Sequence, residues 1–366
     1  MHVLIATDAW HPQVNGVVNT LTRLQSELGL RGVETILLTP QQFFRVALPG
    51  YRELRVAIPE QGAVRRFIAD AAPDCVHIAT EGPIGWAVRR LCIAEGRRFT
   101  TSYHTKFPEY ANRIFGLPES WVYALERRFH DKSAGVMVAT PSLETELHQR
   151  GFSRLMHWSR GVDIERFRPR LDCSPRSEPV FLLVSRISRE KNIEAFLEAP
   201  MPGRKLVVGD GPQLAALRRR YPNVVFAGRK TGPELAALYA AADVFVFPSR
   251  TDTFGLVLLE ALASGLPVAA YPVTGPIDIV EHGVSGILDA DLGKAAKAAL
   301  RLDRRAARTR AETFTWARAA EQFLDNLKAA NAAAATPGWT PAMHSWSPIA
   351  QPSLGPDARL SGHHDG

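Results

Sequence analysis

The segment SRTDTFGLVLLEALASGLP, residues 249–267, decides how this chain is organised. It follows the apolar run Val244–Phe247, which is typical of a buried strand. The pattern predicts a helix that begins near Phe254 and ends at Gly265-Leu266-Pro267, because glycine followed by proline commonly stops helices. From residue 256 to residue 263 that helix is apolar on every side except at Glu260. We therefore expect a buried helix whose single acid needs a hydrogen-bonding partner.

The start of this helix has the features of an anion site. Asp252 supplies a second carboxylate just before the first turn, and Thr253 is placed to cap the helix. The first backbone N–H groups of a helix have no partner within it, so they attract groups such as phosphates. A structural salt bridge would explain one acid alone. The combination of Asp252, free amides and Glu260 favours a ligand site.

Length and composition define a broad class of protein. The 366 residues suffice for two domains, and 46% hydrophobic with 22% charged residues is typical of a soluble globular chain. No apolar run is long enough for a membrane helix, and no basic leader precedes the first strand. The three cysteines, Cys75, Cys92 and Cys173, have neither disulfide nor zinc spacing. These features predict a cytoplasmic protein.

The net charge of +7 narrows the choice of partners. A basic surface attracts anionic substrates, anionic membranes or nucleic acid. Since the sequence has no recognition helix, zinc finger or aromatic-basic stripe, we exclude nucleic acid. Peripheral contact with the inner face of the cytoplasmic membrane stays open.

Predicted strands and helices alternate through both halves of the chain, which indicates two α/β domains with parallel, doubly wound sheets. In such sheets ligands bind at the carboxyl ends of the strands. The polar segment 169–179 contains three prolines and is predicted to link the domains. We divide the chain into a first domain (1–168), the linker (169–179), a second domain (180–313), a final helix (314–330) and a disordered tail (331–366).

Candidate site residues follow the predicted strands. Gly16 opens the first helix, where its backbone could approach a phosphate closely. The chain has no GxGxxG motif, which argues against an NAD-dependent oxidoreductase. In the second half, Arg186 and Lys191 bracket a turn and could clamp a diphosphate, although solvated surface charge is the simpler alternative. A lone strand-end histidine such as His104 is more often structural than catalytic. Further candidates at strand ends are Asp8, His11, Asn15, Tyr103, Lys106, Gly209, Gly228 and Arg229.

Together these motifs resemble the retaining glycosyltransferases of family 4, over about residues 1–328. The resemblance implies a GT-B fold, in which two Rossmann-like domains face each other across a cleft and a C-terminal helix crosses back to the first domain. The motifs that carry it are Asn15-Gly16-Val17, Ser102-Tyr103-His104-Thr105, Gly161-Val162-Asp163, Ser185-Arg186, Glu190-Lys191-Asn192, Gly209-Asp210-Gly211-Pro212, Phe254-Gly255 to Glu260, and Phe314-Thr315-Trp316.

The resemblance also implies roles for single residues. Glu260 matches the acid that holds the ribose hydroxyls, and Asp252 matches an acid that contacts the donor sugar, where the family usually has glutamate. His104 matches a histidine near the donor sugar and phosphate. The remaining donor contacts would come from Arg186 and Lys191 at the diphosphate, Gly16, Gly209, Gly228 and Arg229, and the helix start Thr253, Phe254, Gly255 and Leu256. Asp8, His11, Asn15, Tyr103 and Lys106 would lie on the acceptor side.

The implied activity is transfer of a sugar from a nucleotide-sugar to a hydroxyl acceptor, with retention of configuration and without a cofactor. The sequence has no DxD-type acidic pair in a suitable loop, so we expect no metal. Thr80-Glu81-Gly82-Pro83 and Tyr103–Tyr110 resemble sulfoquinovosyl- or glycosyl-diacylglycerol synthases and GDP-mannose-dependent mannosyltransferases. We favour a UDP-sugar such as UDP-glucose and a diacylglycerol acceptor in glycolipid biosynthesis. GDP-mannose is the alternative donor. A nucleotide-sugar epimerase and a non-catalytic nucleotide-sugar-binding protein stay as weaker alternatives.

Overall fold

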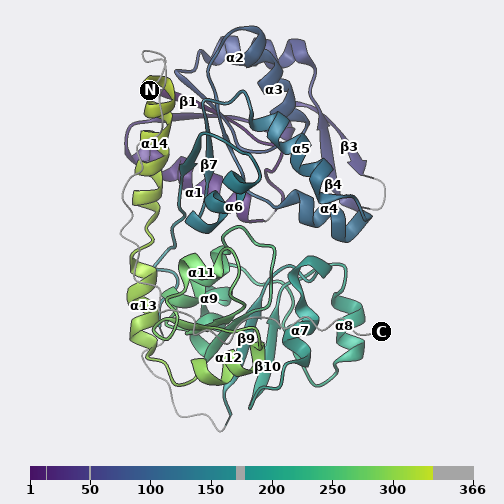
Figure 1. The fold of residues 1–366 in the computed structure, drawn as a ribbon, viewed down its shortest axis with the longest axis vertical. Coiled ribbons are helices and arrows are strands. Elements are labelled where there is room, and N and C mark those ends of the chain that lie inside the picture. Colours follow the sequence, from purple (N-terminus) through teal and green to yellow (C-terminus); the bar gives the residue numbers. More distant parts are fainter. Residues whose placement is uncertain (14, 49–50, 170–177, 333–366) are drawn as a thin grey trace.

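The computed structural model describes residues 1–13, 15–48, 51–169 and 178–332 and forms two α/β lobes (Figure 1). The first lobe contains the strands β1 (His2–Ala6), β2 (Glu34–Leu38), β5 (Cys75–Ile78), β6 (Thr100–Ser102), β7 (Gly135–Val138) and β8 (Leu155–His157). Its helices are α1 (Gly16–Leu30), α2 (Gln61–Ala71), α3 (Pro83–Ala94), α4 (Phe107–Phe115), α5 (Glu119–His130) and α6 (Pro141–Gln149), with a 3-10 turn, η1 (Pro40–Gln42).

The second lobe repeats this plan. Its strands are β9 (Val180–Val184), β10 (Arg204–Val208), β11 (Val225–Phe226), β12 (Val244–Phe247), β13 (Val268–Ala270) and β14 (Gly286–Leu288). Its helices are α7 (Ile193–Glu198), α8 (Leu214–Arg220), α9 (Gly232–Ala241), α10 (Leu256–Ala263), α11 (Pro276–Ile279), α12 (Leu292–Ala299) and α13 (Arg304–Glu312), with a 3-10 turn, η2 (Arg189–Lys191).

Both six-stranded sheets are parallel throughout, with the orders β2-β1-β5-β6-β7-β8 and β11-β10-β9-β12-β13-β14. In each sheet the strand that comes first in the chain, β1 or β9, lies inside the order. The next strands are added on one side of it and the later strands on the other, which is the doubly wound arrangement. In β9, Phe181 and Leu183 pack in one core cluster while Leu182 and Val184 pack in another. Successive strand residues point to opposite faces, so a strand buried on both faces reads as continuously apolar. The predicted fold class is confirmed.

A long helix, α14 (Trp316–Ala332), returns the chain to the first lobe (Figure 1). Its Phe323 and Leu327 are buried in the core that contains Val3 and Ile5 of β1. The backbone passes so close to Gly161 that a Cβ there would lie 2.2 Å from the amide nitrogen of Trp316. The first lobe is therefore completed by the last described segment of the chain.

Several elements were not predicted from the sequence. These are the strand β3 (Phe44–Leu48), helices α4, α11 and α13, and the edge strands β8 and β14. A short strand was expected at Leu54–Ala57 and lies within β4 (Tyr51–Ile58), but its antiparallel pairing with β3 was not foreseen. Most of the predicted linker and nearly all of the predicted tail, at 170–177 and 333–366, lie outside the described residues, as does Cys173. In the described part of the chain, no helix is both long and apolar enough to span a membrane.

Candidate active site

The loops after β6 and β12 meet between the two lobes. Thr253 donates a 2.7 Å hydrogen bond from its hydroxyl to the backbone oxygen of His104. This contact joins residues 149 positions apart. The structure thereby brings together two of the sequence-predicted site motifs, one from each lobe.

Helix α10 begins two residues later than the sequence predicted. It starts at Leu256, and its N-cap is Gly255 with φ +89°, a left-handed backbone that favours glycine. Thr253 is therefore not the cap, and its hydroxyl serves the contact with His104 instead. A Cβ on Gly16 would lie 3.9 Å from Leu256 Cδ1. The starts of α1 and α10 thus lie next to each other across the lobe boundary.

Glu260 has a protein partner on one side of its carboxylate. Tyr239 of α9 donates a 2.9 Å hydrogen bond to Glu260 Oε2. Burial raises the pKa of Glu260 to about 7, while the Tyr239 hydroxyl and the charge of Arg166 oppose that rise. The hydrogen-bonding partner expected for Glu260 is therefore Tyr239, a residue of the same lobe.

Lys191 and Asp252 form an ion pair in which both side chains are largely buried. The Lys191 ammonium lies 2.5 Å from Asp252 Oδ1, and the two side chains are 18% and 19% exposed. Asp252 and the Tyr110 hydroxyl of α4 raise the pKa of Lys191 above its ordinary value, against the effect of burial. The second oxygen, Asp252 Oδ2, is buried without a hydrogen-bond partner in the described chain. A buried acceptor of this kind is costly unless a ligand donor reaches it.

Arg186 differs from Lys191 in its surroundings. It is exposed, and among the described residues its guanidinium makes no hydrogen bond or ion pair. The turn beside it is tightly packed, since a Cβ on Gly209 would lie 1.8 Å from the oxygen of Ser185. Gly209 also donates its amide to the oxygen of Gly228 at 2.9 Å. Arg186, Gly209, Gly228 and the exposed Arg229 thus lie on adjoining turns at the carboxyl edge of the second sheet.

His104 lies at the boundary between the two lobes, and its ring has defined neighbours. Its Nδ1 is 3.1 Å from Nη2 of Arg160, a residue that sequence reasoning did not select. Burial, followed by the charge of Arg160 and the ring of His77, keeps the pKa of His104 well below its ordinary value. The histidine is therefore neutral at physiological pH. The sequence signal for Arg160 is its position directly before the Gly161-Val162-Asp163 motif.

The other first-lobe candidates have local structural roles. Asp8 accepts hydrogen bonds from Thr80 Oγ1 (2.9 Å) and from the amides of Ile84 (2.8 Å) and Gly85 (3.3 Å) at the start of α3. Asn15 caps α1, and its Oδ1 accepts from the amides of residues 17 and 18 at 3.0 Å each. His11 is exposed, with its ring 5.2 Å from that of Trp10. Their acceptor-side assignment stays a prediction.

Tyr103 requires a correction. Its side chain is 0% exposed, and its hydroxyl donates a 2.9 Å hydrogen bond to Glu126 Oε2 inside the first lobe. Burial raises the pKa of Glu126 to about 9, so this acid is protonated at neutral pH. A strand-end tyrosine can turn into the core as readily as into the cleft, because successive strand residues face opposite ways. Tyr103 is therefore a buried core residue of the first lobe in this structure, and its hydroxyl is already used by Glu126.

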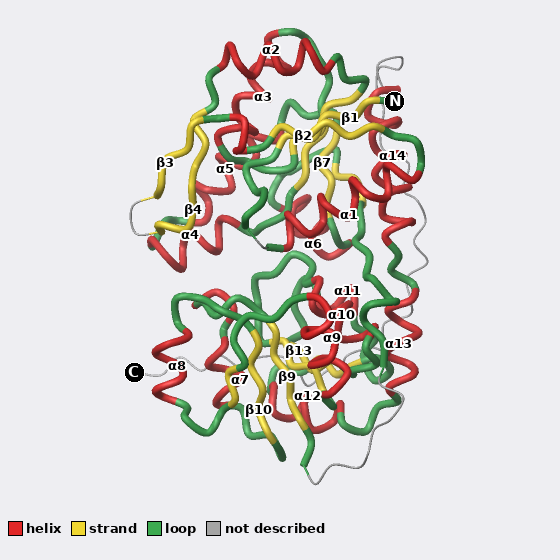
Figure 2. Tube along the Cα trace, turned by 180° about the vertical axis from the view of Figure 1, so that it is seen from behind, coloured by secondary structure: helices red, strands yellow, loops and turns green. Residues whose placement is uncertain are grey.

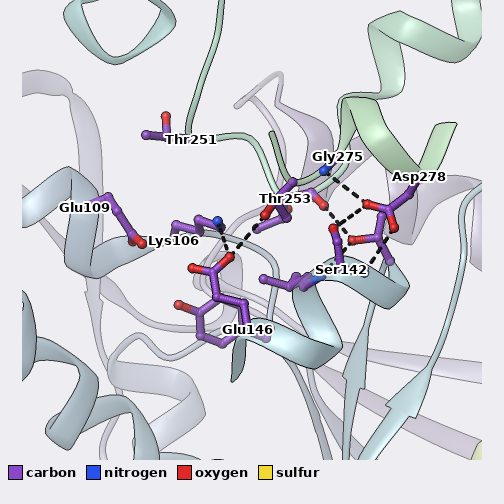
Figure 3. Close-up of polar contacts among 12 residues, drawn as sticks. Lys106, Glu109, Ser142, Glu146, Thr251, Thr253, Gly275 and Asp278 are labelled. Carbon is purple, nitrogen blue, oxygen red and sulfur yellow. Dashed lines mark hydrogen bonds and ion pairs between the residues drawn. The ribbon is translucent and has the colours of Figure 1, made fainter. Parts of the chain in front are cut away.

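Lys106 is also less available than the sequence suggested. Its ammonium is paired with Glu146 Oε2 at 2.6 Å, and the residue is 6% exposed. Glu146 Oε2 also accepts from Thr274 Oγ1 of the second lobe at 3.1 Å. Lys106 is thus part of the contact between the lobes (Figure 3).

A further contact between the lobes joins Ser142 of α6 to Asp278 of α11. Asp278 accepts from the Ser142 amide at 3.0 Å and from its hydroxyl at 2.5 Å, and Gly275 N donates to the same carboxylate at 3.3 Å (Figure 3). Nothing in the local sequence marks these residues, because a contact between lobes leaves no periodic pattern. The described residues contain no cluster of histidine, cysteine and acidic side chains that could hold a metal ion.

Comparison with known proteins agrees with this geometry. Residues 14–166 match the family described as Glycosyltransferase Family 4, and residues 178–304 match Glycosyl transferases group 1. A GDP-mannose-dependent alpha-mannosyltransferase from Mycobacterium tuberculosis (strain CDC 1551 / Oshkosh) is 30% identical over 321 residues, 79% of this chain and 83% of the relative. An alpha-monoglucosyldiacylglycerol synthase from Streptococcus pneumoniae (strain ATCC BAA-255 / R6) is 28% identical over 319 residues, 74% of this chain and 71% of the relative.

The fold has solved counterparts as well. A sucrose-phosphate synthase from Thermosynechococcus elongatus superimposes with a TM-score of 0.76 at 22% identity, covering 92% of this chain and all of that one. The two-lobed architecture is therefore the GT-B fold. The matched family models and the similar mannosyltransferase show that the chain belongs to family 4 of the glycosyltransferases.

Proposed function

We propose that this glycosyltransferase moves mannose from GDP-mannose to a hydroxyl group of a membrane lipid, with retention of configuration and without a metal ion. The choice of GDP-mannose as donor is supported by the similarity to GDP-mannose-dependent alpha-mannosyltransferases over most of both chains. The sequence alone favoured a UDP-sugar. A UDP-sugar with a diacylglycerol acceptor stays the second candidate, because the glucosyldiacylglycerol synthase is also similar over about three quarters of this chain.

The proposed donor position follows from the unsatisfied groups of the site. The exposed guanidinium of Arg186 and the amides at the starts of α1 and α10 would hold the diphosphate. Glu260 would accept from the ribose hydroxyls through the oxygen that Tyr239 leaves free. The buried Asp252 Oδ2 would accept from a sugar hydroxyl, which would give that oxygen its missing partner.

In the proposed reaction the bond between the anomeric carbon and the β-phosphate oxygen breaks as the acceptor oxygen bonds to the same face of that carbon. The acceptor proton passes to a phosphate oxygen, so nucleoside diphosphate leaves with it. Negative charge grows on the phosphate, and preorganised cations and amides stabilise that charge most. The ion pair with Asp252 keeps Lys191 charged and in place for this role.

Exposed apolar side chains support a membrane-borne acceptor. Of the thirteen exposed large apolar residues in the described chain, seven lie on β3, β4, α4, α5 or the turn before α5, elements that adjoin on one side of the first lobe (Figures 1 and 2). Trp121 is 71% exposed, and Leu125 and Arg128 follow it on the same face of α5. Trp beside arginine suits an anionic bilayer interface. The seven residues are Phe44, Val46, Ile58, Phe107, Leu117, Trp121 and Leu125.

The donor is tested by incubating the full chain with a panel of GDP- and UDP-sugars, membrane lipids and soluble glycans, and weighing the products by mass spectrometry. GDP-mannose should give a mannosylated lipid. Transfer from UDP-sugars alone would select the second candidate. Transfer only to soluble acceptors would contradict the lipid assignment, and nucleotide binding without any transfer would indicate a non-catalytic protein.

The membrane contact is tested by co-sedimentation with phosphatidylglycerol vesicles. Replacing Trp121 and Leu125 with alanine should lower binding, whereas Leu30→Ala, at a 79% exposed position on α1, should not. Equal binding by all three proteins would show that α5 does not meet the bilayer.

A further inference from the structure

The two ring nitrogens of His104 have opposite surroundings. Nδ1 lies 3.1 Å from Arg160 Nη2, within hydrogen-bond distance. Nε2 is buried and has no hydrogen-bond partner among the described residues. One nitrogen is thus fixed by the protein, and the other is left for a ligand.

The chemistry of the pair decides which nitrogen carries the proton. A guanidinium can only donate, so Nδ1 of His104 must be the acceptor. A neutral imidazole that accepts at Nδ1 carries its hydrogen on Nε2. Burial lowers the pKa of His104 most. Two titratable groups, Arg160 and the buried His77, lower it further. The described chain places no carboxylate against it that would favour the charged form.

Arg160 is held rigidly enough to impose this state. It is 4% exposed, and its Nη1 donates to the backbone oxygens of Trp158 (2.5 Å) and Ser159 (2.9 Å). Its guanidinium carbon also lies 4.1 Å from the centre of the Trp158 ring. No carboxylate is paired with it in the described part of the chain. In the described chain no carboxylate therefore competes with His104 Nδ1 for the N–H groups of Arg160 Nη2.

The support continues to the crossover helix. Trp158 Nε1 donates to the oxygen of Ala319 at 3.1 Å, and its ring lies 5.0 Å from that of Phe323, both on α14. The His104 ring packs 5.8 Å from the Trp158 ring. Helix α14, Trp158, Arg160 and His104 thus form one continuous chain of contacts that ends at the site.

We propose that Arg160 is a positioning residue that holds His104 as a neutral ring with its hydrogen on Nε2. His104 then donates a hydrogen bond to the transferring sugar or its leaving phosphate, and it does not take the acceptor proton. The assignment to sugar or phosphate rests on the proposed function. The state of the ring does not.

The ring state is measured on the free full-length protein by nitrogen-15 NMR with labelled histidine, assigning His104 from the signal lost in His104→Gln. Wild type should show the Nε2–H form alone, without titration between about pH 6 and 9. Arg160→Met should give mixed tautomers, and Arg160→Gln, which retains an N–H donor, should give less mixing. A wild-type ring with hydrogen on Nδ1, or a charged ring at neutral pH, would overturn the proposal.

Kinetics test the consequence. His104→Gln places an amide N–H near the position of Nε2 and should retain at least tenfold more kcat than His104→Phe, which has no donor. Arg160→Met should lower kcat about tenfold with a smaller change in donor KM. The same change in the His104→Gln background should cost less than about twofold, since glutamine has no tautomer to fix. Equal losses in both backgrounds would mean general damage and would refute the positioning role.

The two sets of results separate this inference from the proposed function. If no sugar is transferred from any donor to any acceptor, the proposed function fails. The NMR result still decides whether Arg160 fixes the tautomer of the His104 ring.

Discussion

The hydroxyl of Tyr239 lies 2.9 Å from Glu260 Oε2, so the acid on helix α10 is held by its own lobe before any ligand arrives. The carboxylate nevertheless keeps a pKa of about 7, because burial outweighs the hydrogen bond. Its ionised form is therefore costly in the free protein, and a ligand that donates to the carboxylate would offset that cost.

Glu260→Gln should stabilise the free protein at alkaline pH. The folded pKa of about 7 exceeds the ordinary value of 4.5, so the native state binds more protons and the free energy of unfolding falls as pH rises from about 4.5 to 7. Glutamine removes this loss. Urea unfolding at pH 8 should show a gain of about 1–2 kcal/mol that disappears near pH 4. Calorimetry should show weaker nucleotide binding.

The matched control is Glu234→Gln, at an exposed acid on α9. It should change neither the pH dependence of stability nor nucleotide affinity. Unchanged nucleotide binding in Glu260→Gln and Glu260→Ala would disprove the ribose assignment.

Arg186→Met and Lys191→Met should differ in stability although both remove a cation from the site. Arg186 is exposed and unpaired among the described residues, so its loss should change the free energy of unfolding by less than about 0.5 kcal/mol. Loss of Lys191 leaves the largely buried Asp252 carboxylate uncompensated and should cost about 2–4 kcal/mol. Both should lower kcat, Arg186→Met by about 100-fold. Equal stability of the two variants in urea would contradict the ion-pair geometry.

Asp278→Ala should loosen the contact between the lobes. It removes both hydrogen bonds to Ser142, each worth about 1 kcal/mol. Small-angle X-ray scattering should report a larger radius of gyration, and donor KM should rise. Asp291→Ala, which removes the side-chain cap of α12, should cost similar stability without changing the radius. A radius unchanged in Asp278→Ala would mean that other contacts hold the lobes.

Tyr103→Phe should destabilise the protein without affecting acceptor use. The variant removes the hydrogen bond to Glu126 from a buried site, at a cost of about 1–2 kcal/mol in thermal unfolding. The KM for the acceptor should stay within error of wild type. A selective rise in that KM would restore Tyr103 to the acceptor side.

Local patterns were sufficient to predict much of the architecture. The apolar strands and the glycine and proline stops gave both parallel sheets and the buried helix α10. Short elements such as β8 and α11 escaped prediction, because three or four residues carry too little periodicity. The α10 start was placed two residues early, since only the backbone conformation of Gly255 identifies it as the cap.

The sequence by itself determined that Glu260 is an isolated acid on a buried helix and that His104 ends a strand, because composition and periodicity are local properties. Only the tertiary structure decided what these groups contact. Tyr239 reaches Glu260 from another helix, Arg160 reaches His104 across 56 positions, and Tyr103 turns into the core. Such partners are set by how separate elements pack, and packing depends on the whole chain.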